Sequence, residues 1–209
     1  DHKTGESVDF NSSYAVLENE AKKLYPDCKI VYRWNTRDCI TLDKIPYIGL
    51  YSHTTPNLYI GTGFNKWGMT SSNVAATIIS NSINGNITPY SYVFDSTRIH
   101  PIKNRVELKN IIVQSANSLV IDKLKSFEHD FSSIPNDSAT IIDVNSEKVG
   151  IYKDPSGKLF AVNPTCTHLG CLLSWNSVDK TWDCPCHGSR FDYTGKNIYD
   201  PAMKNLNFY

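Results

Sequence analysis

The chain has 209 residues, and its 21 basic and 21 acidic side chains cancel in formal charge. This length allows one large or two modest domains, and we expect two. The balanced charge, without long runs of one sign, excludes a global field that would attract nucleic acid or an anionic membrane. No apolar stretch approaches the roughly 20 residues that span a bilayer, and the polar first residues do not resemble a signal peptide. We therefore expect a soluble, cytoplasmic protein without a membrane anchor.

Helix and strand signals are mixed over the first hundred residues, which indicates an α/β segment. A helix is predicted over residues 13–24, and strands are predicted over residues 29–34 and 57–61. A second helix follows, with Thr70, Ser71 or Ser72 as its N-cap and Asn84-Gly85 as its end. Its apolar stripe is formed by Val74, Ala75, Ile78, Ile79 and Ile83.

A different pattern occupies the rest of the chain. Residues 106–127 carry a three-to-four-residue repeat that predicts a single amphipathic helix. Residues 132–138 are a predicted linker or turn. Beyond it, short β-rich runs at 140–144, 148–152 and 159–162 predict a small antiparallel sheet. The repeat of the helix consists of Leu108, Ile112, Ala116, Leu119, Lys123 and Phe127.

Four of the six cysteines are grouped between Cys166 and Cys186. A secreted disulfide framework spreads its cysteines along a short chain, so this grouping indicates a metal site instead. The site is a C-x-H … C-x-x-H pair, with 15 residues between His168 and Cys184. Two thiolates suit one iron and two neutral imidazoles suit the other iron of a [2Fe-2S] centre.

Two alternatives to an iron-sulfur site remain open at this point, a zinc site and a disulfide with two unrelated histidines. Zinc fingers with two cysteines and two histidines place both cysteines first. Here each half supplies one residue of each kind, which favours the iron-sulfur interpretation.

Residues 166–171 and 184–189 resemble the two cluster-binding boxes of the Rieske family. The flanking residues 157–162, Trp182, 191–195 and 200–202 resemble that family as well. The resemblance implies that both histidines face solvent, where a redox partner protein or a small electron carrier can dock. The implied cluster ligands are Cys166, His168, Cys184 and His187.

The remaining two cysteines of the group, Cys171 and Cys186, match a pair that Rieske proteins of cytochrome bc complexes use as a disulfide between the boxes. Two free buried thiols are the alternative, because a cytoplasmic pool keeps most disulfides reduced.

Ligation of the cluster by two histidines implies a reduction potential in a range of about −150 to +300 mV.

Three further residues are implied to lie around the cluster, namely Ser189, Phe191 and Pro201. Ser189 stands where high-potential members of the family have a hydrogen-bond donor to sulfur. Phe191 stands where those members have a tyrosine whose hydroxyl also donates to a ligand sulfur. Phenylalanine has no such donor, so we expect an intermediate potential.

Residues 34–38, 43–49 and 57–70 resemble the C-terminal part of the D-amino-acid-oxidase-like flavoproteins. In that family the stretch matching residues 61–70 leads into a helix whose first amides approach the flavin ring. The G-x-G-x-x-G turn that such a site also needs is absent from this sequence. We therefore expect a fragment of a bacterial FAD/Rieske fusion protein, which in isolation binds FAD weakly or not at all. The implied FAD contacts in the full-length protein are Gly61, Gly63, Lys66, Gly68, Met69 and Thr70.

These observations predict an α+β protein with three parts. Residues 1–100 are the flavoprotein segment, 101–135 a helical connector and 136–209 an all-β Rieske domain. The expected function is one-electron transfer within a FAD-dependent oxidoreductase, and the alternatives are a Rieske subunit of a cytochrome bc-type complex and a non-redox zinc module. We expect the other polar candidates to be structural or solvated rather than catalytic, namely Arg33, Arg37, His53 and Lys66.

Overall fold

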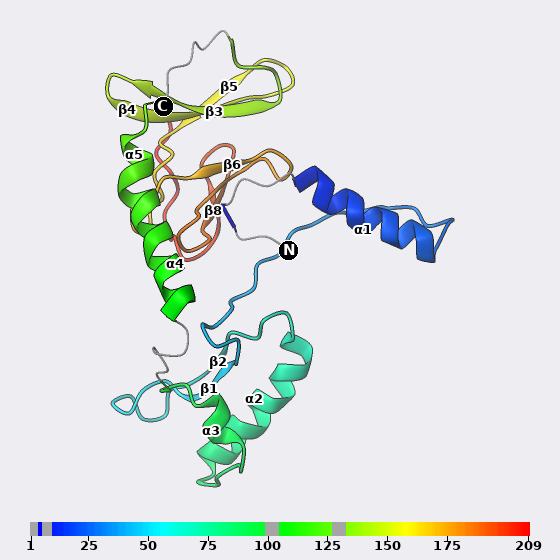
Figure 1. Ribbon diagram of the computed structural model, residues 1–209, viewed down its shortest axis with the longest axis vertical. Coiled ribbons are helices and arrows are strands. Elements are labelled where there is room, and N and C mark those ends of the chain that lie inside the picture. Colours follow the sequence, from blue (N-terminus) through cyan, green and yellow to red (C-terminus); the bar gives the residue numbers. More distant parts are fainter. Residues whose placement is uncertain (1–3, 6–9, 99–104, 127–132) are drawn as a thin grey trace. The chain divides into compact units, whose positions relative to one another are not determined.

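The structure is a computed structural model that describes residues 4–5, 10–98, 105–126 and 133–209. The chain divides into two compact units. One is Thr36–Asn110, and the other joins Asp1–Asn35 to Ile111–Tyr209. Helices combine with small antiparallel sheets, which confirms the predicted α+β class (Figure 1). None of the helices in the described ranges has the length and hydrophobicity needed to cross a bilayer.

The unit Thr36–Asn110 is built on a two-stranded antiparallel sheet, in which β1 (Tyr47–Leu50) pairs with β2 (Tyr59–Thr62). Helix α2 (Gly68–Ile83) follows β2, and the short helix α3 (Ser91–Phe94) comes next. The core of the unit forms where the buried Ala75 and Ile78 of α2 meet Ile48 of β1. The strand predicted at residues 57–61 corresponds to β2. The predicted helix end is confirmed, since Asn84 is the C-cap and Gly85 follows with a φ of 75°.

The start of α2 differs from the prediction. The helix begins at Gly68 with Trp67 as its N-cap, so Thr70, Ser71 and Ser72 lie inside its first turns and the capping prediction is wrong. A turn before the helix explains the earlier start, because the amide of Trp67 already donates to the carbonyl of Phe64 at 2.8 Å. The apolar stripe is also shorter than predicted, since Ile83 is exposed.

The predicted strand at residues 29–34 is wrong. Helix α1 (Phe10–Leu24) lies before it as predicted, but none of the described strands pairs with residues 29–34. Val31, Tyr32 and Trp34 are exposed. A β-rich run becomes a strand only where a neighbouring strand completes its hydrogen bonds, and local composition does not supply that neighbour.

The connecting segment is helical, as predicted, but it is not a uniform α-helix. It consists of α4 (Arg105–Ala116), a π-helical turn η1 (Asn117–Ile121) and α5 (Asp122–Leu124). The predicted apolar stripe is largely uncovered, because Ile112 and Leu119 are both exposed. Phe127, the last residue of that stripe, lies outside the described residues.

Two antiparallel sheets form the C-terminal region. The first has the order β3-β4-β5, from β3 (Ser138–Val144), β4 (Glu147–Lys153) and β5 (Leu159–Val162). The second has the order β6-β7-β8-β9, from β6 (Ser174–Asn176), β7 (Thr181–Asp183), β8 (Arg190–Asp192) and β9 (Asn197–Tyr199). The predicted three-stranded sheet is confirmed (Figure 1).

Side chains of both sheets share one hydrophobic core. Trp182 and Phe191 are cross-strand partners in β7 and β8, and neither is accessible to solvent. Val162 of β5 packs in the same cluster, together with the half-buried Ile141 of β3. This packing holds the two sheets together. The same cluster contains Cys166, Cys171 and Cys184.

Two hairpins of the region use the same turn chemistry. In the β4–β5 turn, a carboxylate oxygen of Asp154 accepts hydrogen bonds from the amides of Ser156 and Lys158. In the β8–β9 turn, Asp192 accepts the equivalent bonds from Thr194 and Lys196. Each aspartate thereby satisfies two amides that no strand partner could reach.

Candidate metal centre

Two loops with the same backbone geometry carry the predicted cluster ligands. In the first loop the amide of Cys166 donates to the carbonyl of Cys171 at 2.8 Å, and the amide of Gly170 donates to Cys166 at 2.9 Å. Residues 184–189 repeat both bonds, at 2.8 and 3.0 Å. Gly170 and Gly188 have a φ of 79° in both loops. The fifth residue of each loop is therefore glycine, because other residues rarely adopt this conformation.

The loops bring two buried sulfur atoms together. Cys166 and Cys184 are 2% and 1% exposed, and their side chains are hydrogen-bonded to each other. The Cys184 thiol, with help from the amides of His168 and Leu169, lowers the pKa of Cys166 to about 6. Bonding to Cys166 and burial raise the pKa of Cys184. A cation bound to both sulfurs would replace the proton of the hydrogen bond between them.

The two predicted histidine ligands lie next to each other. The ring centroids of His168 and His187 are 5.0 Å apart in an edge-to-face arrangement. Burial of its ring and the adjacent His168 lower the pKa of His187, which favours the neutral, metal-binding imidazole. Nδ1 of His168 is buried and has no hydrogen-bond partner among the described residues. A buried polar atom without a partner is costly, so this nitrogen fits a metal ligand.

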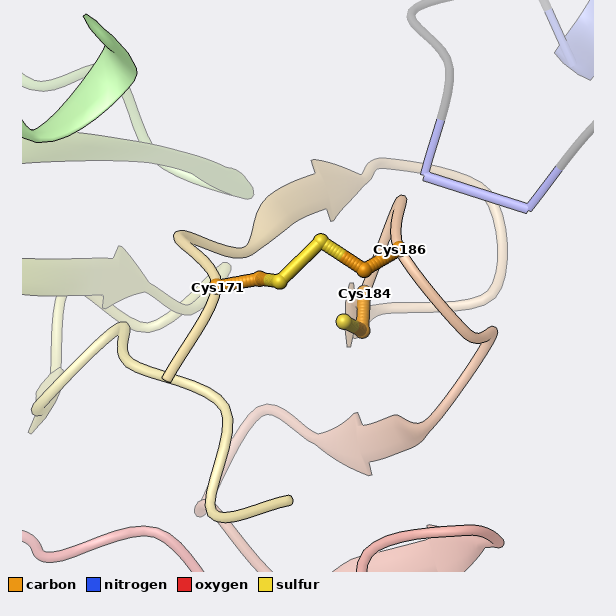
Figure 2. A group of neighbouring side chains, drawn as sticks. All are labelled: Cys171, Cys184 and Cys186. Atoms are coloured by element: carbon orange, nitrogen blue, oxygen red, sulfur yellow. A yellow bond between two sulfur atoms is a disulfide. The ribbon is translucent and has the colours of Figure 1, made fainter. Parts of the chain in front are cut away.

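The other two cysteines of the group form a disulfide between the loops. Cys171 and Cys186 are bonded, as the family resemblance implied (Figure 2). Their sulfurs and that of Cys184 lie within 4.8 Å of one another. Two of the three sulfurs are already joined, so this trio is a crosslink beside Cys184 rather than a second metal site.

A third loop, between β9 and the C-terminal residues, is attached to both boxes. The hydroxyl of Thr167 donates to the carbonyl of Lys204 at 2.7 Å, which connects this loop to the first box. The amide of Ala202 donates to the hydroxyl of Ser189 at 3.0 Å, which connects it to the second. Pro201, which was expected near the cluster, is exposed on the same loop.

The two residues expected to influence the potential are both buried beside the thiols. The Ser189 hydroxyl is hydrogen-bonded to the sulfur of Cys166, where its donation helps to lower the pKa of that thiol. Phe191 packs in the hydrophobic cluster that contains Cys166 and Cys184. A phenyl ring at this position adds no hydrogen bond to either sulfur.

The residues expected to contact FAD lie between the end of β2 and the first turn of α2. Gly63 is buried with a φ of 73°, and a side chain there would collide with Thr41, so its glycine has a structural reason. Gly68 has open space around it and Met69 is exposed, so the first turn of α2 is accessible. A complete flavin site would also need a phosphate-binding turn, which these residues do not contain. Gly61 lies in β2, Lys66 on the connection and Thr70 in the first turn of α2.

One group of site residues was missed from the sequence. Asp183 and Arg190 stand immediately outside the second box, face each other across β7 and β8, and form a buried ion pair. The signal available in the sequence was a pair of opposite charges, one immediately before and one immediately after the second box. Such a pair is recognisable as buried only when both strands are known to lie in the interior.

Two family profiles match the chain. Residues 127–209 match the profile described as Rieske [2Fe-2S] domain. Residues 3–82 match the profile described as FAD dependent oxidoreductase. The two matches lie in the same order as the resemblances found in the sequence.

Individual relatives include several Rieske iron-sulfur proteins. The Rieske 2Fe-2S iron-sulfur protein YhfW of Bacillus subtilis is 38% identical over 205 residues, or 98% of this chain and 40% of its own length. Cytochrome b6-f complex iron-sulfur subunit 1 of Nostoc is 49% identical over 47 residues, covering 22% of this chain and 26% of that protein. The crystal structure of a plasma membrane Rieske protein from Synechocystis aligns with 38% identity and a TM-score of 0.32, over 34% of this chain and 73% of that one. The chain thus spans two fifths of the length of YhfW.

Proposed function

We propose that the chain is the electron-transferring part of a longer flavin oxidoreductase, because residues 127–209 match the Rieske [2Fe-2S] profile and residues 3–82 match the FAD dependent oxidoreductase profile. Cys166 and Cys184 would hold one iron of a [2Fe-2S] cluster, and His168 and His187 would hold the other. When bound, such a cluster supplies one-electron oxidation and reduction. The observation that carries the proposal is the pair of buried cysteine sulfurs, each accepting hydrogen bonds from backbone amides, together with a buried Nδ1 of His168 that has no partner in the described part of the chain.

The protein's own groups prepare this site for negative charge. Amides of residues 168 and 169 donate to the sulfur of Cys166, and amides of residues 186 and 187 donate to that of Cys184. Donors of this kind stabilise thiolates and favour the reduced state of a centre bound to them. The disulfide and the third loop hold the boxes in place, while the exposed His187 offers the approach for a redox partner.

We further propose that FAD is bound in the full-length protein by the residues named above, from the end of β2 to the first turn of α2. The accessible first turn of α2 supports this proposal, because free amides at a helix start favour nearby negative charge. The partner of the cluster would be a redox protein or a small electron carrier. The neutral overall charge supports a partner that recognises the surface around the histidines rather than a strong charge field.

A second candidate function is that of a Rieske subunit in a cytochrome complex. The specific observations in its favour are the disulfide between the boxes and the 49% identity to a b6-f subunit over 47 residues. A full-length protein that binds FAD and reduces its cluster from the flavin would support the first function. Cluster reduction by a quinol, without bound flavin, would support the second.

The first experiment tests the cluster itself. The purified protein should contain two irons and two acid-labile sulfides per chain, and its reduced form should give the EPR spectrum of a mixed Cys/His cluster. His187→Ala should abolish that spectrum because it removes one of two ligands on the outer iron. The exposed His53 provides the control, and His53→Ala should leave the spectrum unchanged. One zinc without iron, or an unchanged spectrum in His187→Ala, would contradict the assignment.

The second experiment tests the oxidoreductase context with the full-length protein. Reduction of its FAD should be followed by reduction of cytochrome c, an acceptor of single electrons. The same protein with His187→Ala should retain its flavin absorbance and lose most of this activity. Equal cytochrome c reduction by both proteins would place the cluster outside the electron path.

A further inference from the structure

A buried ion pair flanks the second box, at the end of β7 and the beginning of β8. Nε of Arg190 donates to a carboxylate oxygen of Asp183 at 2.8 Å, and both side chains are 5% exposed. The two residues are cross-strand partners in β7 and β8. The next pair along the hairpin is Cys184 and Ser189, joined by a hydrogen bond of 2.8 Å from amide to carbonyl. The ion pair is therefore adjacent in the chain to a predicted ligand on one side and to the hydroxyl donor on the other.

Further hydrogen bonds fix the geometry of the pair. The same carboxylate oxygen of Asp183 accepts from the hydroxyl of Thr181, which itself accepts from Nη2 of Arg190. The other oxygen accepts from the side-chain amide of Asn176. Nη2 of Arg190 also donates to Asp179 at 2.6 Å. The charges are thus bound in one orientation, as an interior ion pair requires.

The charges of this network do not sum to zero, and a net negative charge remains. Two carboxylates, Asp179 and Asp183, share the single guanidinium of Arg190. Water screens these charges weakly because Asp183 and Arg190 are almost completely buried. A centre beside them would experience the negative charge of Asp183 and the positive charge of Arg190 separately. Net charge around an iron-sulfur centre is one of the factors that set its potential.

We propose that Asp183 and Arg190 are positioning residues of the metal centre, which hold the second box and adjust its reduction potential in opposite directions. The inference rests on the proposed function, since it requires a cluster at this site. Asp183 disfavours an added electron and lowers the potential. Arg190 favours the added electron and raises it.

Protein-film voltammetry of the cluster-loaded protein tests the proposal. Asp183→Asn keeps the shape of the side chain and removes its charge, so the midpoint potential should rise. Arg190→Gln removes the positive charge and should lower the potential. Arg190→Lys keeps the charge without the planar fork and should return the potential toward the wild-type value. Simple loosening of the box would move the first two variants in the same direction.

A matched control comes from the other sheet of the same domain. Asp143 forms an ion pair with Lys148 between β3 and β4, outside the hairpin that carries the second box. Asp143→Asn should leave the potential unchanged. A shift as large as that of Asp183→Asn would mean that any loss of charge has this effect, and it would overturn the proposal.

The remaining outcomes are equally decisive. Shifts of the same sign in Asp183→Asn and Arg190→Gln, or no shift in Asp183→Asn, would overturn the inference. If Arg190→Gln retains too little iron for voltammetry, Asp183→Asn and Arg190→Lys decide together: a raised potential in the first and a near wild-type potential in the second support the inference, and equal shifts of the two overturn it. Wild-type protein that binds no iron would instead overturn the proposed function, which the iron analysis detects before any variant is compared.

Discussion

The hydroxyl oxygen of Ser189 accepts a hydrogen bond from the amide of Ala202 at 3.0 Å, across 13 residues of chain. Neither residue is accessible to solvent. The bond fixes the orientation of the hydroxyl, because an oxygen that accepts from the amide has its proton left to donate. That proton is directed to the sulfur of Cys166. One side chain therefore connects the third loop, the second box and a predicted ligand in the first.

Ser189→Ala should lower the midpoint potential of the cluster-loaded protein. The substitution removes a hydrogen bond to sulfur, and such bonds favour the reduced, more negative state. A bond to a charged acceptor contributes about 1.5–3 kcal/mol, but only its strengthening on reduction enters the potential, so a shift on the order of tens of millivolts is expected. Protein-film voltammetry measures it. The hydroxyl of Ser156, in the β4–β5 turn, provides the control, and Ser156→Ala should have no effect.

Phe191→Tyr should shift the potential upward. The resemblance to high-potential Rieske proteins implies that a hydroxyl at this position donates to a ligand sulfur, and the structure places Phe191 in the cluster with Cys166 and Cys184. The expected shift is again on the order of tens of millivolts. Phe160→Tyr adds a hydroxyl to the half-buried ring of β5 and serves as the control. An unchanged or lower potential in Phe191→Tyr, with an intact EPR spectrum, would show that residue 191 does not reach a sulfur.

The boxes could be predicted from the sequence because their chemistry is local. Gly170 and Gly188 fix the two loops within six residues each, so the motif contains most of its own geometry. The three-stranded sheet was predictable for a similar reason, since its turns carry strong local signals such as the aspartate that bonds to Ser156.

Features that depend on distant residues, or on a turn that composition does not mark, were predicted poorly. Residues 29–34 have β-rich composition but no strand partner among the described residues. The N-terminus of α2 was misplaced because the turn at Phe64–Trp67 decides its start, while serine and threonine after Met69 suggested a later one. The ion pair of Asp183 and Arg190 depends on strand register, which local composition does not reveal.

Removal of the disulfide should destabilise the Rieske domain. Cys171 and Cys186 are 15 residues apart, and a crosslink over that separation restricts the unfolded chain by about 3 kcal/mol. The double variant Cys171→Ser, Cys186→Ser should therefore unfold at a lower denaturant concentration than the wild type, as measured by tryptophan fluorescence. Cys39→Ser changes an exposed free cysteine and should retain the wild-type midpoint. Equal midpoints for the double variant and the wild type would mean that the loops are held by the core and the third loop alone.

The last prediction concerns the salt bridge between Asp43 and Arg98 in the unit Thr36–Asn110. Nε and Nη2 of Arg98 donate to the two carboxylate oxygens of Asp43 at 2.8 and 3.0 Å, and the arginine side chain is 6% exposed. Hydrogen bonds from Arg98 hold the pKa of Asp43 well below its usual range. A carboxylate with a lowered pKa in the folded state stabilises that state above its unfolded pKa of about 3.9, and this stabilisation is lost as the pH falls toward the folded value.

Asp43→Asn should therefore reduce the free energy of local unfolding by about 2–3 kcal/mol at neutral pH, because it leaves a buried guanidinium without its counter-charge. The difference from the wild type should shrink as the pH falls below about 4, where Asp43 of the unfolded wild-type chain begins to gain its proton while the folded state keeps it ionised. Hydrogen exchange of the amides in β1 and β2, compared between the two proteins at each pH, measures this difference. The exposed Asp38 supplies the control, and Asp38→Asn should exchange like the wild type throughout. A difference between Asp43→Asn and wild type that stays constant from neutral pH to pH values well below 4 would show that the charge of Asp43 does not stabilise this unit.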